Sequence, residues 1–81
     1  MMRMELEAVL AFISGHIGKF GFAPTIREIS AATGLRSTNG VRYYTAKLQE
    51  NGWLEWTANR VRTMRVTDAG RDRLQHWKAW Q

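Results

Sequence analysis

The segment 24–52 constrains the fold of this 81-residue chain more than any other part of the sequence. Thr25 and Glu28 have the spacing of a capping box, in which the two side chains each satisfy a backbone amide at the start of a helix. Apolar side chains then recur at helical spacing, and Gly34 stands where a left-handed residue would end the helix. The segment therefore predicts a short helix that begins at about Ile26 and ends before Gly34.

A second helix is predicted directly after the first. Leu35 and Arg36 form the turn, and Ser37 is a residue type that caps helix N-termini. The helix over 38–51 then ends at an Asn-Gly pair. Its expected buried stripe consists of Val41, Tyr44, Thr45 and Leu48. Two helices around a tight turn make a helix-turn-helix motif.

The segments on either side of this motif complete the expected fold. Helical spacing of apolar residues predicts a first helix over 4–20. Its apolar stripe consists of Leu6, Val9, Leu10, Ile13, Ile17 and Phe20. Beyond the motif the hydrophobic period changes to two, which predicts a hairpin over 53–66 with a turn at Ala58-Asn59. Trp56 is expected to fill the small core beneath it, and Trp53 is expected to pack where the helix over 38–51 ends.

After the hairpin, Thr67 and Asp68 are expected to cap a last helix that runs toward Trp80. The sequence thus predicts a mainly α fold with a small β-hairpin, in the order of a winged helix-turn-helix: a three-helix core, a two-stranded wing and a C-terminal helix. At this length the residues 1–81 are expected to form a single domain.

Composition and charge narrow the classes of function. The net charge is +5, and residues 36–65 hold six basic and two acidic side chains whereas residues 1–35 are balanced. Clustered basic charge on a helix and a hairpin is typical of a nucleic-acid-binding face, although a solvated surface is the alternative. The chain has no cysteine, which excludes a disulfide framework and a thiolate zinc site.

Neither histidine has a partner at metal-ligand spacing, and the acidic residues form no pair suited to acid-base work. We therefore expect a non-enzyme without cofactor or metal. No apolar run is long enough for a bilayer and no signal peptide is recognisable, so a cytoplasmic protein without membrane contact is expected.

The motif residues resemble those of a known family. The stretch Pro24-Thr25-Ile26-Arg27-Glu28-Ile29, followed by Thr33-Gly34-Leu35-Arg36-Ser37 and then Asn39, Leu48 and Gly52, is similar to the N-terminal DNA-binding domain of the LexA repressor family. The resemblance implies that the second helix of the motif enters the major groove and that the wing approaches the DNA backbone. It further implies that DNA meets Ser37, Asn39, Gly40, Arg42 and Tyr43.

Two departures limit what the resemblance implies. LexA itself has acidic residues at the positions of Arg42 and Tyr43, so its operator sequence is not expected to apply here. The C-terminal peptidase domain of LexA has no counterpart in this sequence, so self-cleavage is not expected either.

The chemistry of the predicted recognition helix points in the same direction. Asn39, Arg42 and Tyr43 fall on the side opposite the buried stripe. Arginine pairs bidentately with guanine and asparagine with adenine, whereas Tyr43 suits a thymine methyl or a phosphate. Gly40 would let the backbone approach DNA closely, unless the helix simply begins loosely there. The candidate DNA-binding residues are Arg36, Ser37, Thr38, Asn39, Gly40, Arg42, Tyr43, Lys47, Arg60 and Arg62.

The predicted function is a sequence-specific, double-stranded DNA-binding transcriptional regulator, and a repressor in particular. A winged-helix protein-interaction module, such as an adaptor or antirepressor, is the alternative, and a replication or packaging initiator is a third. Leu74, Trp77 and Trp80 form one side of the last helix and suggest a homodimer interface. The competing interpretation is that the two rings fold back onto the first helix.

Overall fold

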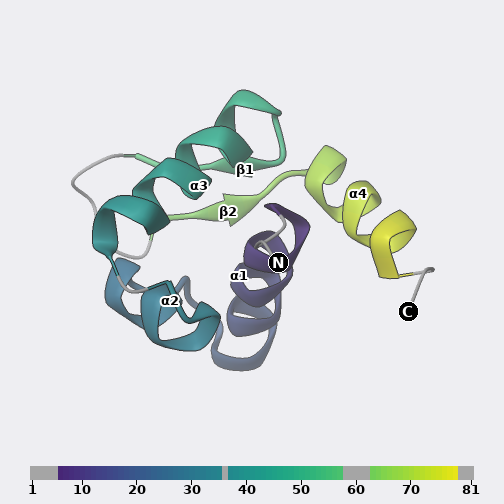
Figure 1. The fold of residues 1–81 in the computed structure, drawn as a ribbon. Coiled ribbons are helices and arrows are strands. Elements are labelled where there is room, and N and C mark those ends of the chain that lie inside the picture. Colours follow the sequence, from purple (N-terminus) through teal and green to yellow (C-terminus); the bar gives the residue numbers. More distant parts are fainter. Residues whose placement is uncertain (1–5, 36, 58–62, 79–81) are drawn as a thin grey trace.

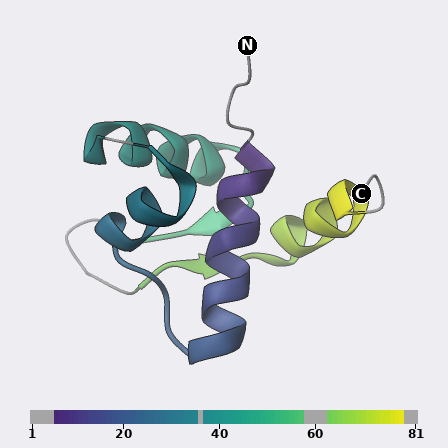
Figure 2. The same cartoon turned by 60° about the horizontal axis from the view of Figure 1, so that its bottom comes forward.

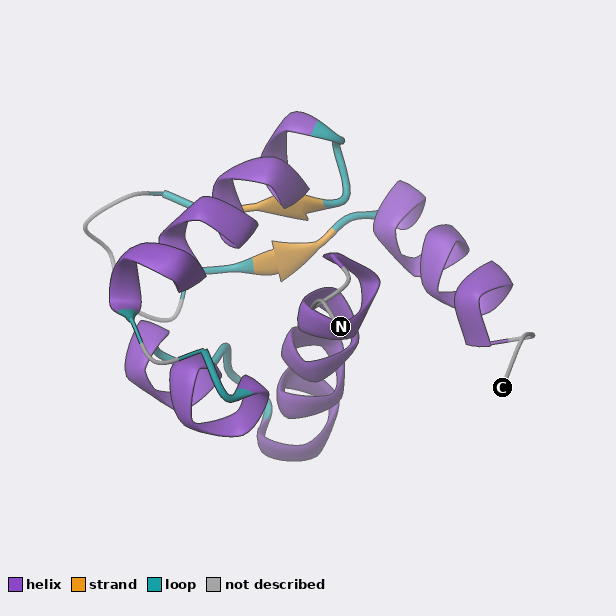
Figure 3. Cartoon of the chain, in the orientation of Figure 1, coloured by secondary structure: helices purple, strands orange, loops and turns teal. Residues whose placement is uncertain are grey.

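The computed structural model describes residues 6–35, 37–57 and 63–78. Within these residues the elements are α1 (Leu6–Phe20), α2 (Ile26–Thr33), α3 (Thr38–Glu50), β1 (Leu54–Glu55), β2 (Arg65–Val66) and α4 (Asp68–Lys78). Figure 1 shows their arrangement, and Figure 3 shows how short the strands are beside the helices. The predicted order of a winged helix-turn-helix is confirmed, and the helix boundaries agree with the prediction within the described residues.

The core is assembled around α1. Val9, Leu10 and Ile13 of this helix are fully buried, which confirms the predicted apolar stripe at its centre. They pack with buried side chains from α2, α3, both sides of the hairpin and α4, namely Ile29, Val41, Leu48, Leu54, Met64 and Leu74. Figure 2 shows α1 passing beside the hairpin, with α4 on the side away from α2 and α3. One hydrophobic cluster therefore joins all these elements.

The start and end of α2 follow the predicted chemistry. Thr25 Oγ1 accepts a hydrogen bond from the Glu28 amide at 3.1 Å, and Glu28 Oε1 accepts one from the Thr25 amide at 2.8 Å. Gly34 ends the helix with φ of 79°, and its amide donates to the Ser30 carbonyl. The capping box and the left-handed glycine thus fix both ends of a helix that is only 8 residues long.

Removal of the Thr25 hydroxyl is expected to destabilise the domain. We expect Thr25→Ala to lower the free energy of unfolding by about 1 kcal/mol, because the Glu28 amide at the start of α2 loses the hydroxyl that accepts its hydrogen bond. Thr25→Ser keeps the hydroxyl and is expected to stay close to the wild type. Urea denaturation of the three proteins checks this, and an alanine variant as stable as the serine variant would show that the cap contributes nothing.

Phe20 departs from the predicted apolar stripe. Its side chain is 51 % exposed rather than packed in the core. The helix ends at this residue, and Gly21 turns the chain with φ of 83°. The ring consequently extends past the core and packs on His16 and Phe22, with centroid distances of 4.6 and 5.9 Å. The inward placement of Phe20 was therefore wrong.

The hairpin is short and antiparallel. Leu54 pairs with Val66 and Glu55 with Arg65. Leu54 is buried and Val66 half-buried, whereas Glu55 and Arg65 are exposed, so the predicted alternation is confirmed. Trp53 and Trp56 are half-buried against the core, as expected. The predicted turn at residues 58–59 lies outside the described residues.

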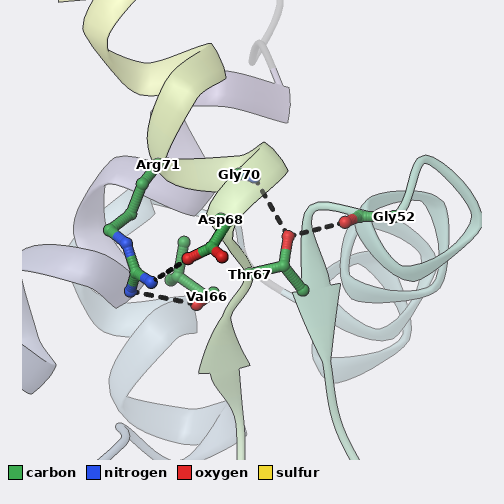
Figure 4. Close-up of polar contacts among 6 residues, drawn as sticks. All are labelled: Gly52, Val66, Thr67, Asp68, Gly70 and Arg71. Atoms are coloured by element: carbon green, nitrogen blue, oxygen red, sulfur yellow. Dashed lines mark hydrogen bonds and ion pairs between the residues drawn. The ribbon is translucent and has the colours of Figure 1, made fainter.

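Thr67 connects the hairpin to α4 (Figure 4). Its amide donates to the Trp53 carbonyl at 3.0 Å, and its hydroxyl donates to the Gly52 carbonyl at 2.6 Å. The same hydroxyl accepts a hydrogen bond from the Gly70 amide at 3.0 Å, which confirms the predicted cap.

None of the helices in the described ranges is both long and apolar enough to cross a membrane.

Candidate nucleic-acid interface

The two sides of α3 differ sharply in burial. Val41, Thr45 and Leu48 have no exposed surface, and they hold the helix against the core. Side chains on the other side are exposed, as predicted from the helical spacing: Asn39, Arg42, Tyr43 and Ala46. The outer side of α3 therefore carries an amide, a guanidinium and a phenol from its N-terminal half. These groups are chemically suited to the edges of DNA bases.

Local hydrogen bonds define how α3 begins. Ser37 Oγ accepts the Asn39 amide at 3.0 Å, which confirms the predicted cap. Thr45 is buried, and its hydroxyl donates to the Arg42 carbonyl at 3.0 Å. This bond satisfies a polar group inside the core without drawing on the outer side chains. The helix that presents the candidate base-reading residues is thus anchored at its cap and along its inner side.

Gly40 has open space beside it. A methyl group at this position would meet no atom within 4 Å, apart from chain neighbours and the helix's own backbone. The packing of the domain therefore does not require glycine at position 40. A small residue here leaves the backbone near the start of α3 accessible to a bound polymer.

Tyr43 is held by its neighbours although 59 % of its surface is exposed. Its ring packs edge-on against Tyr44, with a centroid distance of 5.7 Å. Lys47 Nζ lies 5.6 Å from the Tyr43 centroid and 3.5 Å from Glu50 Oε1. Tyr43 and Lys47 are therefore oriented together on the outer side of α3. A partly ordered aromatic side chain loses less conformational entropy when a ligand covers it.

α2 contributes a basic residue that was not among the predicted contacts. Arg27 is exposed in the first turn of α2. The first helix of a helix-turn-helix crosses the DNA backbone while the second enters the groove. Arg27 could have been found from the sequence, because it falls outside the Ile26 and Ile29 stripe. We add it to the candidate interface as a backbone contact.

The predicted site residues fall into two groups. The structure brings together on α3 and its cap the residues Ser37, Thr38, Asn39, Gly40, Arg42, Tyr43 and Lys47. Three further predicted contacts, Arg36, Arg60 and Arg62, lie outside the described residues. The described part of the candidate interface therefore consists of α3 with its cap, together with Arg27 of α2.

The residues of α4 that were predicted to form a dimer interface are partly buried within the domain. Leu74 is 6 % exposed and belongs to the core, so its prediction as an interface residue was wrong. Trp77 is half-buried and packs against the core, whereas Trp80 lies outside the described residues. α4 is tied to α1 by the pair between Arg73 Nη2 and Glu7 Oε2 at 2.7 Å. The burial of Leu74 follows from this docking of α4 onto α1.

Acidic and histidine side chains do not gather into a candidate metal site. Among the described residues no group of three or more histidine, aspartate and glutamate side chains lies close enough to hold a metal ion. His16, one of the two histidines, packs between aromatic rings, and its Nδ1 lies 2.9 Å from the Phe22 carbonyl oxygen.

Comparison with known proteins agrees with this geometry. The sequence profile of the LexA DNA binding domain matches residues 5–63. A LexA repressor from Pediococcus pentosaceus is 40 % identical over 67 residues, which are 83 % of this chain and 32 % of that protein. A LexA repressor from Anaeromyxobacter dehalogenans is 41 % identical over 70 residues, 86 % of this chain and 30 % of that protein.

The LexA repressor of Bifidobacterium adolescentis is 40 % identical over 60 residues, which cover 74 % of this chain and 23 % of that protein. This chain thus spans about a third or less of the length of these relatives. The matched part contains α1, the helix-turn-helix and β1, and it includes the exposed side of α3. The chain belongs to the LexA DNA-binding domain family.

Proposed function

We propose that this chain binds double-stranded DNA sequence-specifically and acts as a transcriptional repressor. The observation that carries the proposal is the outer side of α3, where Asn39, Arg42 and Tyr43 are exposed together on a helix whose other side is locked in the core. A helix with this arrangement fits the major groove and reads base edges from its N-terminal half. Membership in a family described by DNA binding supports the same assignment.

The roles of the individual residues follow from their chemistry. Arg42 donates two parallel hydrogen bonds to guanine, and Asn39 pairs with adenine. Tyr43 contacts a thymine methyl group or a phosphate. The remaining residues position the protein on the backbone without reading sequence: Arg27, Arg36, Ser37, Thr38, Lys47, Arg60 and Arg62. Gly40 allows the start of α3 to approach the DNA closely.

The direct test is fluorescence anisotropy with a random pool of genomic DNA fragments as salt is raised, followed by selection of the tightest-binding sequences. Steep loss of affinity with salt and one enriched motif are expected. A steep salt dependence without a motif contradicts sequence-specific reading and indicates an architectural role. Absence of binding at low salt contradicts the proposal and favours the protein-interaction module.

Lys47 is expected to act through phosphate alone. We expect Lys47→Ala to weaken binding of all sequences to a similar degree and to reduce the salt slope by about 1. The selected motif is expected to stay the same, because Lys47 Nζ lies over the Tyr43 ring and pairs with Glu50. Selection experiments on both proteins check this, and a changed motif would place Lys47 among the base-reading residues.

We also propose a homodimer on DNA that uses the C-terminal end of α4, with Trp77 and Trp80 at its centre. Leu74 supports this surface from within the core rather than contributing to it. A two-fold repeat in the selected motif and a protein mass that doubles with concentration in sedimentation are the expected results. A motif without repeat and a constant monomer mass contradict the dimer without affecting the DNA-binding assignment.

We further propose that residues 1–81 act as one domain, in the cytoplasm, without catalytic activity. The single hydrophobic cluster that joins the described elements supports the first point. The family description, which names binding rather than a reaction, supports the last.

A further inference from the structure

A groove of about 360 Å³ lies between α1, β2 and the start of α4. It is distinct from the outer side of α3, and none of the predicted DNA contacts within the described residues lines it. Its lining residues are Ser14, Ile17, Gly18, Arg65, Val66 and Arg71. Two of the six carry a positive charge and none carries a negative charge. The two aliphatic side chains and the glycine provide an apolar part beside the charged groups.

Arg71 is held in place at this groove. Its guanidinium pairs with the Asp68 carboxylate, and Nη1 donates to the Val66 carbonyl at 3.4 Å. Figure 4 shows this guanidinium beside β2, whereas the hydrogen bonds of Thr67 lie on the other side of the first turn of α4. A guanidinium has five N–H donors, so donors remain for a ligand. Because the side chain is already ordered, a bound anion would gain these hydrogen bonds at a reduced entropic cost.

Arg65 supplies the second charge from β2. It is exposed, and no described residue forms an ion pair with it. Asp68 offsets part of the Arg71 charge. Its side chain is almost fully exposed, however, so solvent screens the interaction between the two charges. Glu55 lies opposite Arg65 in the hairpin, but it does not line the groove and forms no ion pair with Arg65. The charged side chains among the described lining residues are therefore the two arginines. Arginine is the residue best suited to planar, bidentate recognition of carboxylate and phosphate.

We propose that this groove is a binding site for a small organic anion, with a phosphate or carboxylate group on Arg65 and Arg71 and an apolar body on Ile17 and Val66. The volume lies within the lower part of the range for small-molecule sites, roughly 300 to 1,000 Å³. The site rests on different residues from the DNA interface, so each assignment stands or falls without the other. β2 is the returning strand of the wing. A ligand bound in this groove would therefore contact the wing, the element proposed to approach the DNA backbone.

Gly18 offers a way to block the site without disturbing the fold. A Cβ at Gly18 would meet no atom within 4 Å apart from chain neighbours and the helix's own backbone, and the same holds for Gly15 on the same helix. Gly15 does not line the groove. Gly18→Glu places a carboxylate where the ligand anion would sit, whereas Gly15→Glu makes the same charge change outside. Both changes replace a glycine inside α1, so neither is expected to weaken the helix.

The test is an NMR titration of the ¹⁵N-labelled protein with three probes: phenyl phosphate, inorganic phosphate and benzoate. We expect saturable shifts of the Ser14, Gly18, Val66 and Arg71 amides with phenyl phosphate, at a dissociation constant of about 1 mM. Inorganic phosphate is expected to bind about tenfold more weakly, because it lacks the apolar body. The benzoate titration distinguishes a carboxylate ligand from a phosphate ligand by which probe binds more tightly.

Three variants decide the outcome. Gly18→Glu and Arg71→Gln are expected to weaken phenyl phosphate binding at least about tenfold, and Gly15→Glu is expected to leave it within about twofold. Saturation that persists in Gly18→Glu overturns the proposal, as does an equal loss in both glutamate variants. Absence of a saturable shift at the groove amides of the wild-type protein with any of the probes overturns it as well.

Discussion

Replacement of Gly70 by alanine is expected to lower the free energy of unfolding by about 3 kcal/mol or more. A Cβ at this position would lie 2.2 Å from the Trp53 carbonyl oxygen and 2.9 Å from Val66 Cγ1. The Trp53 carbonyl cannot withdraw easily, because it accepts the Thr67 amide that joins the hairpin to α4. At roughly 4–8 °C per kcal/mol for a domain of this size, the midpoint of thermal unfolding should fall by at least about 12 °C.

A matched glycine serves as the control for this prediction. Gly15 also lies within a helix, but a Cβ there meets nothing within 4 Å. Gly15→Ala is expected to raise stability by up to about 1 kcal/mol through helix propensity alone. Thermal unfolding followed by circular dichroism compares both variants with the wild type. A Gly70→Ala protein that unfolds within 2–3 °C of the wild type, roughly half a kcal/mol, would contradict the close approach of α4 to the hairpin.

Replacement of Arg42 by alanine is expected to weaken binding to the selected DNA site roughly 5- to 150-fold, which corresponds to about 1–3 kcal/mol. The loss arises because the bidentate bond to guanine disappears. Arg42→Lys keeps the charge but not the planar fork, so the salt slope is expected to stay the same while discrimination at one base pair is lost. Anisotropy titrations with the selected site and its single-base variants provide these values.

Lys19→Ala is the control, because it removes one positive charge from the last turn of α1. Lys19 lies over the Phe20 ring, outside the interface on α3. The affinity of the Lys19→Ala protein for the selected site is expected to stay within about twofold of the wild type. Equal losses in the Arg42 and Lys19 variants would indicate that net charge, and not the guanidinium of Arg42, determines the affinity.

The local part of the fold could be predicted because local chemistry determines it. The Thr25 and Glu28 pair, the left-handed Gly34 and the Ser37 cap each act within a few residues, and each was found as expected. The exposed side of α3 also follows from spacing alone once its buried stripe is assigned. These are the features that place Asn39, Arg42 and Tyr43 on one surface.

The features that sequence reasoning missed depend on contacts between distant segments. Phe20 keeps helical spacing with the apolar stripe, yet α1 ends at this residue and the chain turns away at Gly21, so the ring stays exposed. Helical periodicity does not contain that information. Gly70 reads as a weak position in a helix, although its close neighbour is the carbonyl of Trp53. Arg65 and Arg71 come together only because β2 and α4 are both packed beside α1. Leu74 was predicted to lie on the surface because the packing of α4 against the core is likewise a contact between distant segments.

We propose that the outer side of α3 is the surface that reads DNA. The most direct measurement is an NMR titration of the ¹⁵N-labelled protein with the DNA duplex that the selection enriches. We expect the largest amide shifts within residues 37–47, with smaller shifts at Arg27 and little change around Phe20 and Phe22. Shifts concentrated around Phe20 and Phe22, with residues 39–43 unaffected, would contradict the assignment of the outer side of α3 as the DNA-reading surface.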